Sequence, residues 1–519
     1  MPLASWPVTL KAVLRTAVEG RPLPRDSAEA YEQACEWLCT ETDPARRDTI
    51  SPAHPSRVDL LAAGRRVAAA LQLGDADALV RDPGEPGLAI SAAAGGDEPD
   101  GTGHRVDCTE YLLLKLTETA LMTALAARRY AFSHRSFQEF LAARYLQVHQ
   151  TPAQVRREML LIGNGSSRHV VDSQHEVAAW LAVGDDALFD EILGCDPPVL
   201  LLADLAARSE ADRGRVAAAL LGLVRDDYTV QLDSSLLYRL DHPGLATQLA
   251  PLLGLGQPPN ELAAALLMAR ACPAAALTRP LLALAEDPQA SESVRAIAVE
   301  AVDPGAGQEA ASRILELARG SLPDLVGAAL AWLWPGRLAT ADMLGMLPRP
   351  HPDRLASGWG FLRTVPQQLQ PADLADALAW AGTTIPGSPN HDHMVLAVRI
   401  LAWAARTIHQ GAASTSVAAL KLAEALLLLA RSEAIDEHGL PLDELRDALA
   451  ADAAVRRAIG RRLLDQPGAV EDLVYARAAQ LGLFPRSDAA YWASQLLALP
   501  AESRDRDADS ASRGPRGRA

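Results

Sequence analysis

The chain has 519 residues, of which 49% are hydrophobic and only 4% are aromatic, and it carries a formal net charge of −16. Ala and Leu therefore do most of the burying, which favours helices, because strands prefer the β-branched and aromatic side chains that are scarce here. The acidic balance, without a cluster of basic residues, argues against a nucleic-acid surface as the main partner.

The chain shows no sign of secretion or of a membrane span. Lys11 and Arg15 interrupt what would be the apolar core of a signal peptide, and the longest run without Asp, Glu, Lys or Arg, residues 242–260, contains four prolines. We therefore expect a cytoplasmic protein with no membrane partner. Five cysteines at neither disulfide nor zinc spacing are expected to be buried, reduced thiols: Cys35, Cys39, Cys108, Cys195 and Cys272.

The first segment, to about residue 73, is predicted to be helical. Apolar residues recur at helical spacing from Leu10 to Val18, a second helix is expected over residues 27–40, and a third over residues 57–71. The next stretch, residues 82–107, is rich in Gly and Pro, and it is predicted to be a loop.

A helix, a short hairpin and another helix are expected after this loop. Residues 110–119 suit a helix and residues 131–134 suit a short strand. Ser136 is expected to cap a helix over residues 137–148, with Glu139 three positions later completing a capping box. This order of elements is compatible with a winged helix.

From about residue 151 to about residue 500 the pattern predicts only helices with short breaks. The clearest unit is residues 281–302, in which one helix should end at Glu286, Asp287 and Pro288 should turn the chain, and a second helix should follow. Two helices with one apolar face each can bury those faces by stacking on neighbouring pairs. Further candidate pairs, at irregular spacing, occupy about residues 177–225, 312–347, 395–433 and 442–483.

These patterns predict a mostly α-helical protein in four parts. They are a helical domain over residues 1–75, a winged helix with a short β-hairpin over residues 76–149, an irregular HEAT-like α-solenoid over residues 150–500, and a disordered tail over residues 501–519, which lacks residues that form a core.

The most specific segment is YAFSHRSFQEFLAARYL, residues 130–146. It resembles the winged-helix signature of NACHT-domain proteins in the STAND class of NTPases, in which Phe-x-His precedes Ser-Phe-Gln-Glu-Phe-Leu-Ala-Ala. Residues 6–38 look like the helical domain that follows the nucleotide-binding core in that family. Residues 327–347 look like the helical region downstream of the winged helix in bacterial members. The resemblance covers most of residues 6–380, and only the central motif is sharp.

The resemblance implies two nucleotide-facing residues. In the family, the His of the Phe-x-His element reaches the β-phosphate of bound ADP and helps to hold a closed resting state, and that position here is His134. The family also places a Pro against the adenine, and the matching residue is Pro7. On the residues alone, the alternative for His134 is a ring packed in the hairpin with both nitrogens satisfied locally. Gln138 and Glu139 are expected to be capping residues, and the core is expected to include Phe137, Phe140, Leu141 and Tyr145.

The phosphate-binding half of the family is not found in this sequence. No G-x-x-x-x-G-K-[ST] motif occurs, and no strand ending in acidic residues precedes Pro7 to hold Mg²⁺. One charge-assisted hydrogen bond contributes roughly 1.5–3 kcal/mol, against the ~8 kcal/mol that micromolar binding demands. We therefore expect this polypeptide alone to be no enzyme and to hold no cofactor, since ATP or ADP with Mg²⁺ would need a complete nucleotide-binding domain. A truncated gene model, a split gene and a decayed remnant all fit.

What the resemblance implies is the regulatory and sensor portion of a NACHT-type signalling NTPase, related to bacterial antiphage or conflict systems. Its helical repeats would bind a protein or another foreign trigger, and its winged helix would gate a nucleotide held elsewhere, for example by a separate ATPase half. The alternative is a helical-repeat scaffold that binds proteins without any nucleotide switching.

The hypothesis that the chain is a metal-dependent enzyme would rest on His391, Asp392 and His393, because His-x-His can bind a metal. No carboxylate-rich partner motif accompanies them, and Asn390 next to Pro389 suits a helix cap that would leave both histidines in a first turn. No metal site is therefore expected, and no G-x-S-x-G nucleophile motif occurs.

Overall fold

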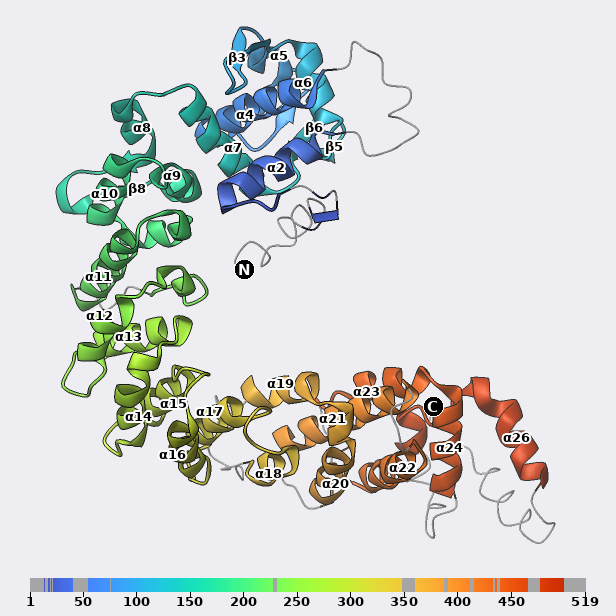
Figure 1. Cartoon of the computed structure of the whole chain (residues 1–519). Helices are drawn as coiled ribbons and strands as arrows, with labels where there is room; N and C mark the ends of the chain where they lie inside the picture. Colours follow the sequence, from blue (N-terminus) through green and yellow to red (C-terminus); the bar gives the residue numbers. More distant parts are fainter. Residues whose placement is uncertain are drawn as a thin grey trace, which may run out of the picture. The chain divides into compact units, whose positions relative to one another are not determined.

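The computed structural model describes, besides the single positions 14, 17, 18, 20 and 435, residues 22–40, 55–74, 76–226, 231–347, 360–386, 391–410, 415–432, 439–464 and 477–498. The described chain is mostly helical, with a few short strands (Figure 1). It divides into two compact units, Met1–Ala274 and Ala275–Ala519. The expected helical region over residues 150–500 is thus shared between the two units, and the domain boundaries drawn from the sequence remain predictions.

The first unit begins with a part that combines helices and short strands. Its elements are α2 (Ser27–Leu38), α4 (Arg57–Leu73), β1 (Leu79–Val80), β2 (Leu88–Ala89), α5 (Ile90–Ala93), β3 (Asp97–Pro99), β4 (Arg105–Asp107), α6 (Glu110–Thr117), β5 (Met122–Ala126), β6 (Arg129–Phe132) and α7 (Arg135–Val148). Four predicted helices are therefore present, with ends that differ from the expected ones by two residues at most.

The strands form one four-stranded sheet and one separate hairpin. In the sheet the order is β2-β1-β6-β5, with β1 parallel to β2 and antiparallel to β6, and β5 and β6 forming a hairpin. The chain thus runs from α4 into β1, through α5 and α6, into the β5–β6 hairpin, and β6 returns to lie beside β1. The sheet and the three helices α4, α6 and α7 lie together in Figure 1.

The expected loop over residues 82–107 was wrong in part, because this stretch holds β2, α5 and the β3–β4 hairpin. Its glycines do make turns, since Gly101 and Gly103 have φ values of +91° and +102°. The short elements between the turns are held by distant partners on α4. The Arg65 guanidinium donates to the Asp100 carbonyl at 2.9 Å, and Arg66 pairs with Glu98 at 2.6 Å. Local composition does not reveal such partners.

Helix α4 is the centre of this part and packs against both α6 and α7. A glycine on α4 permits the close approach. A Cβ atom on Gly64 would lie 3.4 Å from Leu121, 3.7 Å from Leu116 and 3.8 Å from Leu141. These leucines are fully buried, so the space beside Gly64 is already filled by side chains of the neighbouring elements.

The rest of the first unit is a run of short helices. Its elements are α8 (Ala153–Leu160), β7 (Leu161–Ile162), β8 (His169–Val170), η3 (Asp172–Gln174), α9 (His175–Ala182), α10 (Asp186–Cys195), η4 (Pro197–Leu201), α11 (Glu210–Asp226), η6 (Leu237–Leu240), α12 (Leu245–Leu249) and α13 (Pro259–Ala271). Helix α9 packs on α7 and thereby joins this run to the part that contains the sheet.

The second unit consists of helices that pack on the next helix in the chain or on the one after it. They are α14 (Thr278–Glu286), α15 (Glu292–Glu300), α16 (Gln308–Ala318), α17 (Pro323–Leu333), α18 (Thr340–Gly345), α19 (Gly360–Gln368), α20 (Leu374–Thr384), α21 (His391–His409), α22 (Thr415–Arg431), α23 (Leu442–Ala450), α24 (Ala453–Leu464), and, after η11 (Arg486–Asp488), α26 (Ala489–Ala498). Contacts also link every second helix, such as α20 with α22 and α22 with α24. Within this unit the arrangement is solenoid-like.

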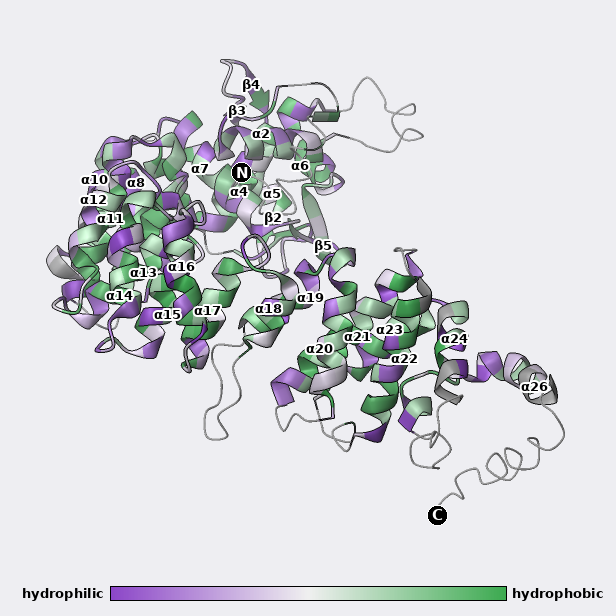
Figure 2. Ribbon diagram, turned by 60° about the horizontal axis from the view of Figure 1, so that its bottom comes forward, coloured by the Kyte–Doolittle hydropathy of each residue, from purple (hydrophilic) through white to green (hydrophobic). Residues whose placement is uncertain are grey.

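The helix pair expected over residues 281–302 is confirmed. Helix α14 ends at Glu286, the chain turns at Asp287, and Ser291 caps α15 by accepting a hydrogen bond from the Val294 backbone N–H. The apolar face of α15 turns inward, and Ala298 is completely buried. In Figure 2 hydrophobic residues similarly lie between helices such as α20 to α23, which pack on one another.

The expectation for the cysteines is confirmed for four of the five. Cys35, Cys39, Cys108 and Cys272 are buried and Cys195 is half-buried, all as free thiols. Burial raises the pKa of both Cys39 and Cys272 to about 12, so these two thiols stay protonated and unreactive at neutral pH. Among the described residues, no helix has both the length and the apolar character that crossing a membrane requires.

Candidate functional site

His134 stands at the junction between the last strand of the sheet and helix α7. Strand β6 ends at Phe132, and α7 begins at Arg135, so His134 is the N-cap residue, with extended backbone angles (φ −147°, ψ 138°). Its side chain is exposed. The sequence motif thus places this imidazole at the start of a helix, where the first backbone N–H groups lack partners within the helix.

The imidazole itself caps the helix. Its Nδ1 accepts a hydrogen bond from the Ser136 backbone N–H at 3.2 Å, and the Ser136 Oγ lies 2.7 Å from the same nitrogen. The expectation that Ser136 caps a helix beginning at residue 137 was therefore wrong. A ring nitrogen two residues earlier serves as the acceptor that Ser, Thr, Asp or Asn side chains usually supply, and the helix starts at Arg135.

This cap determines which ring nitrogen carries the proton. A backbone N–H can only donate, so Nδ1 must present a lone pair, and in the neutral ring the proton is on Nε2. The N–H donor of the neutral His134 ring is therefore at Nε2. Such a donor suits an acceptor such as a phosphate oxygen, whereas the other tautomer would present a lone pair that repels it.

The assigned tautomer can be tested on this chain directly. Nitrogen NMR of the ring-labelled histidines, with His134→Ala to identify the signal, should show a protonated Nε2 and an unprotonated Nδ1 for His134. Ser136→Ala should leave this pattern unchanged, because the donor that selects it is the backbone N–H. A protonated Nδ1 in the neutral ring would contradict the capping geometry.

A cluster of aromatic side chains supports the start of α7. Phe137 and Phe140 are each 1% exposed, as the sequence predicted for core residues. Tyr31 of α2 lies 5.8 Å from the Phe137 ring and 5.4 Å from the Phe140 ring, and Trp180 of α9 lies 5.1 Å from both Tyr31 and Phe140. Burial raises the pKa of Tyr31, and a hydrogen bond with Ser136 opposes this change. The cluster therefore joins α2, α7 and α9, and its Phe137 ring lies 6.4 Å from the His134 ring.

Gln138 and Glu139 are not capping residues, contrary to the expectation. Glu139 is 5% exposed and pairs with Arg135 at 2.6 Å. Burial raises the pKa of Glu139, the charge of Glu176 raises it further, and the hydrogen bond from Arg135 opposes both. Gln138 donates to the Gln72 side chain on α4 at 2.8 Å. Gln138 thus bonds to an element that lies far away in the sequence, whereas Glu139 pairs within its own helix.

An amide chain continues from Gln138 into the first helices that follow the sheet. Gln72 donates to the Ser173 carbonyl at 2.6 Å, and Gln174 donates to the Gln72 carbonyl at 2.8 Å. Gln72 and Gln174 are both buried. These hydrogen bonds connect α7, α4 and the segment before α9, so the helix that carries His134 is tied to the run of helices downstream.

Two ionic clusters hold the other end of this part, and the sequence pattern did not suggest them. Glu32 of α2 accepts hydrogen bonds from Arg65 and from Arg144, the latter at 3.1 Å. Glu98 of β3 binds Arg66 on α4 and, at 2.8 Å, the His149 Nε2 at the C-cap of α7. The partners in each cluster are separated by more than thirty positions, so no spacing rule would have found them.

The remaining candidate residues are the expected adenine neighbour and the two histidines of the His-x-His motif. Pro7, the expected adenine neighbour, lies outside the described residues. His391, Asp392 and His393 occupy the first turn of α21, and the His393 ring packs edge-on against Trp380 at 5.9 Å. In the part of the chain that the structure describes, no group of three His, Cys, Asp or Glu side chains is arranged to hold a metal ion.

Comparisons with protein-family models, with curated proteins and with solved structures each gave no match to this chain. The assignment of a function therefore depends on the segment over residues 130–146 and on the geometry around His134.

Proposed function

We propose that this chain is the regulatory and sensor portion of a NACHT-type signalling NTPase. In this proposal a winged helix gates a nucleotide that another stretch of protein holds, and the helical repeats bind a protein or another trigger. The observation that carries the proposal is the position of His134. It lies in the Phe-x-His element of the family motif, directly after β6, with a ring proton on the Nε2 atom.

The topology around His134 supports a winged helix. In that class a helix leads into the first strand, two further helices follow, and a hairpin returns its last strand to the side of the first. Here α4, β1, α5, α6 and the β5–β6 hairpin follow this order, and β6 pairs with β1, so the proposed winged helix would begin at Arg57 instead of residue 76. Two features are then additions to this order: β2, which pairs in parallel with β1, and the β3–β4 hairpin between the second and third helices.

The free energy of one hydrogen bond supports a gating role for His134 and not nucleotide binding by this chain alone. A single charge-assisted hydrogen bond from His134 contributes roughly 1.5–3 kcal/mol, well below the ~8 kcal/mol of a micromolar complex. No phosphate-loop motif occurs in the 519 residues. His134 would therefore stabilise the resting state of a nucleotide that is already bound to a separate domain or polypeptide.

The packing of α7 supports a route from the nucleotide to the repeats. The Gln138–Gln72 hydrogen bond and the contact between Phe140 and Trp180 join α7 to α4 and to α9. A displacement of α7 on loss of the His134 contact would therefore shift packed side chains in α9 of the downstream run. By resemblance, the system would belong to bacterial conflict systems, chiefly antiphage defence.

The proposal is tested by finding the ATPase half. DNA upstream of Met1 and the neighbouring genes are read for a phosphate-loop sequence, and the encoded polypeptide is produced together with this chain. The purified assembly should retain ADP, and His134→Ala should speed ADP release about 10- to 100-fold, the loss of one charge-assisted hydrogen bond. His104→Ala, a change of another exposed histidine in the β3–β4 turn, is the control and should release ADP at the wild-type rate.

Two results would overturn the switch. One is that no phosphate-loop polypeptide associates with the chain, and the other is that His134→Ala and wild type release ADP equally. Either result would favour the scaffold alternative, a helical-repeat protein that binds partners without a nucleotide. The solenoid-like packing of α14 to α24 is compatible with that function.

A further inference from the structure

A hollow of ≈ 460 Å³ lies beside α11 in the first unit, open to the surface. Small residues on one face of α11, Ala211, Gly214 and Ala218, make one wall at helical spacing. The segment from His242 to Gln248, at the start of α12, makes the other wall. Because these α11 residues have small side chains or none, they do not fill the space in front of the polar groups of the opposite wall.

The most buried of these polar groups is His242, which is 9% exposed. Its Nδ1 lies 2.7 Å from the Leu240 carbonyl oxygen, which can only accept, so Nδ1 donates and the Nε2 atom of the neutral ring is an acceptor. Nε2 lies 3.2 Å from the position that a Cβ atom would take on Gly214. The glycine therefore makes room for the edge of the ring that carries the lone pair.

Gln248 also lines this wall. Its Nε2 donates to the Gly214 carbonyl at 3.3 Å, which orients the amide. Its Oε1 is buried and has no hydrogen-bond partner among the described residues. Because this oxygen is closed off from solvent, it does not face the open space, and the ring acceptor that borders the hollow is the His242 Nε2 beside Gly214.

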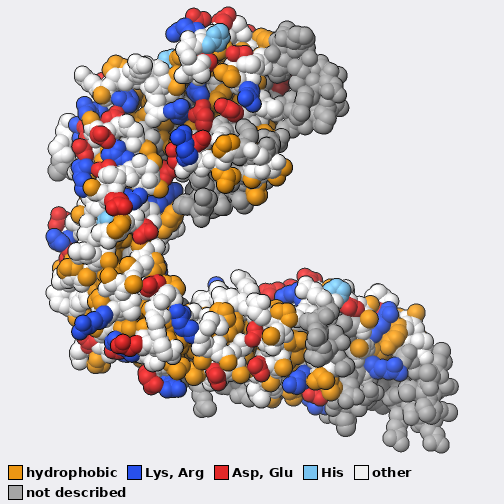
Figure 3. Space-filling view, viewed as in Figure 1, with side chains coloured by type: hydrophobic (Ala, Val, Ile, Leu, Met, Phe, Trp, Pro, Cys, Tyr) orange, Lys and Arg blue, Asp and Glu red, His pale blue; other side chains and the backbone are white. Residues whose placement is uncertain are grey.

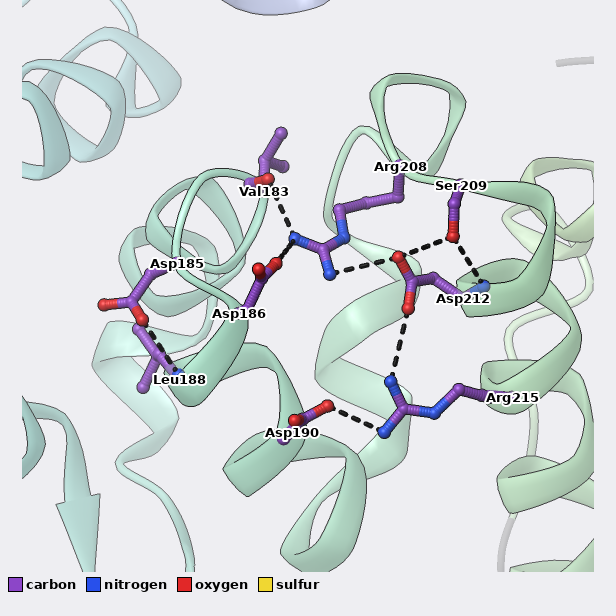
Figure 4. A network of polar contacts seen from close by, with 9 residues as sticks. All are labelled: Val183, Asp185, Asp186, Leu188, Asp190, Arg208, Ser209, Asp212 and Arg215. Atoms are coloured by element: carbon purple, nitrogen blue, oxygen red, sulfur yellow. Dashed lines mark hydrogen bonds and ion pairs between the residues drawn. The ribbon is translucent and has the colours of Figure 1, made fainter.

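The charges at the mouth of the hollow favour a cation. The Arg215 guanidinium is engaged by Asp190 at 2.7 Å and by Asp212 at 3.2 Å (Figure 4). Glu210, by contrast, has no side-chain hydrogen bond or ion pair within the part of the chain that the structure describes. The positive group at the mouth is thus compensated, and the negative group is not.

A wider polar network holds this arrangement in place. Asp212 also binds Arg208 at 3.1 Å and the Ser209 hydroxyl at 2.8 Å, and Arg208 in turn binds Asp186 at the start of α10 at 2.7 Å (Figure 4). The Arg208 guanidinium also lies over the Phe189 ring, 4.3 Å from its centroid. Asp212 and Arg215 are therefore committed to the contact between α10 and α11 and are not available to a ligand.

We infer that this hollow binds a lysine or arginine side chain of a protein partner, with His242 and Glu210 as its acceptors. An ammonium or guanidinium group brings donors and positive charge to a site that offers one ring acceptor and one uncompensated carboxylate. The chain as a whole has a net charge of −16, which attracts a basic partner, although on the visible face in Figure 3 acidic side chains are interspersed with basic ones. The inference rests on the proposed binding role of the helical repeats and names the chemistry of their partner.

The probe is a fluorescein-labelled Gly/Ser peptide with one central lysine and one central arginine, titrated into the full chain and followed by fluorescence anisotropy. Saturable binding is expected. The same peptide with acetyl-lysine and citrulline at these positions should not bind, because it lacks the charge. Spermidine is tested as a competitor, since a free polyamine carries the same ammonium chemistry.

Two pairs of variants locate the binding. Gly214→Ala places a Cβ atom 3.0 Å from the Gln248 Nε2 and should weaken binding about fivefold or more by narrowing the hollow, whereas Gly222→Ala on the same helix meets no atom within 4 Å. Glu210→Gln should weaken binding about fivefold by removing the charge, and Asp226→Asn removes the same charge at the other end of α11. Both control variants should stay within about twofold of wild type.

The inference fails if the peptide does not saturate below about 1 mM, or if Gly214→Ala and Glu210→Gln bind it as wild type does. Spermidine that binds more tightly than the peptide, with the same dependence on these variants, would overturn the assignment to a protein partner. His134→Ala should leave peptide binding unchanged. The failure of the nucleotide switch and the failure of this site can therefore be told apart.

Discussion

Phe140→Ala should destabilise the first unit by about 3–5 kcal/mol, which is the usual cost of removing a buried phenyl ring from a packed core. Phe140 is 1% exposed and contacts both the Tyr31 ring at 5.4 Å and the Trp180 ring at 5.1 Å. The change therefore removes the side chain through which α7 meets α2 and α9 together. The cavity that it leaves lies between α2, α7 and α9, which are far apart in the sequence. These three helices can close the cavity only in part.

The effect should be measured locally, because one melting temperature is not defined for a chain with two units. Hydrogen exchange at low urea should show amides of α7 and α9 exchanging roughly two to three orders of magnitude faster than in wild type. Leu125→Ala, which truncates a side chain that is 56% exposed on β5, is the matched control and should change stability by less than about 0.5 kcal/mol. Equal effects of the two variants would contradict the assigned core.

Glu98→Ala should cost about 3–5 kcal/mol, the range for removing one partner of a buried ion pair. Glu98 is 3% exposed, and each of its two carboxylate oxygens has a cationic or polar partner: Arg66 at 2.6 Å and the His149 Nε2 at 2.8 Å. We expect a loss near the lower end of this range, since Arg66 and His149 are 26% and 29% exposed and can turn toward water.

The neighbouring residue provides a matched control. Asp97 pairs with Arg105 at 3.6 Å, with side chains that are 56% and 61% exposed, so Asp97→Ala should cost about 0–1 kcal/mol. Hydrogen exchange of the β3–β4 hairpin and of the last turn of α7 would measure both variants. If Asp97→Ala lowered stability as much as Glu98→Ala, the ion pair between the two strands of the hairpin would matter as much as the anchorage of Glu98 to α4 and α7. That result would contradict the assigned role of Glu98.

The segments that sequence reasoning predicted well are those whose structure depends on near neighbours. Helices α2, α4 and α6 were found from apolar spacing, and the turn at Asp287 was found from a Pro that follows the end of a helix. Helical hydrogen bonds join residues four positions apart, so a run of sequence contains most of what decides them.

The candidate site was predicted only in part. The motif located His134 between a short strand and a helix, but the expected strand over residues 131–134 included it, whereas β6 ends at Phe132 and His134 caps α7. The roles of Ser136, Gln138 and Glu139 were assigned wrongly, because a capping box was the only local explanation for them. In the structure Gln138 bonds to a residue 66 positions away, which no local rule predicts.

The sequence by itself determined the helical class, the helix pair at residues 281–302 and the resemblance that draws attention to His134, because periodicity, turn residues and a contiguous motif are properties of short segments. Only the tertiary structure decided that the imidazole caps α7 with its proton on Nε2, that Glu98 anchors a hairpin in the expected loop, and that His242 faces a hollow beside Gly214. Each of these depends on which distant groups meet, and that follows from the packing of the whole unit.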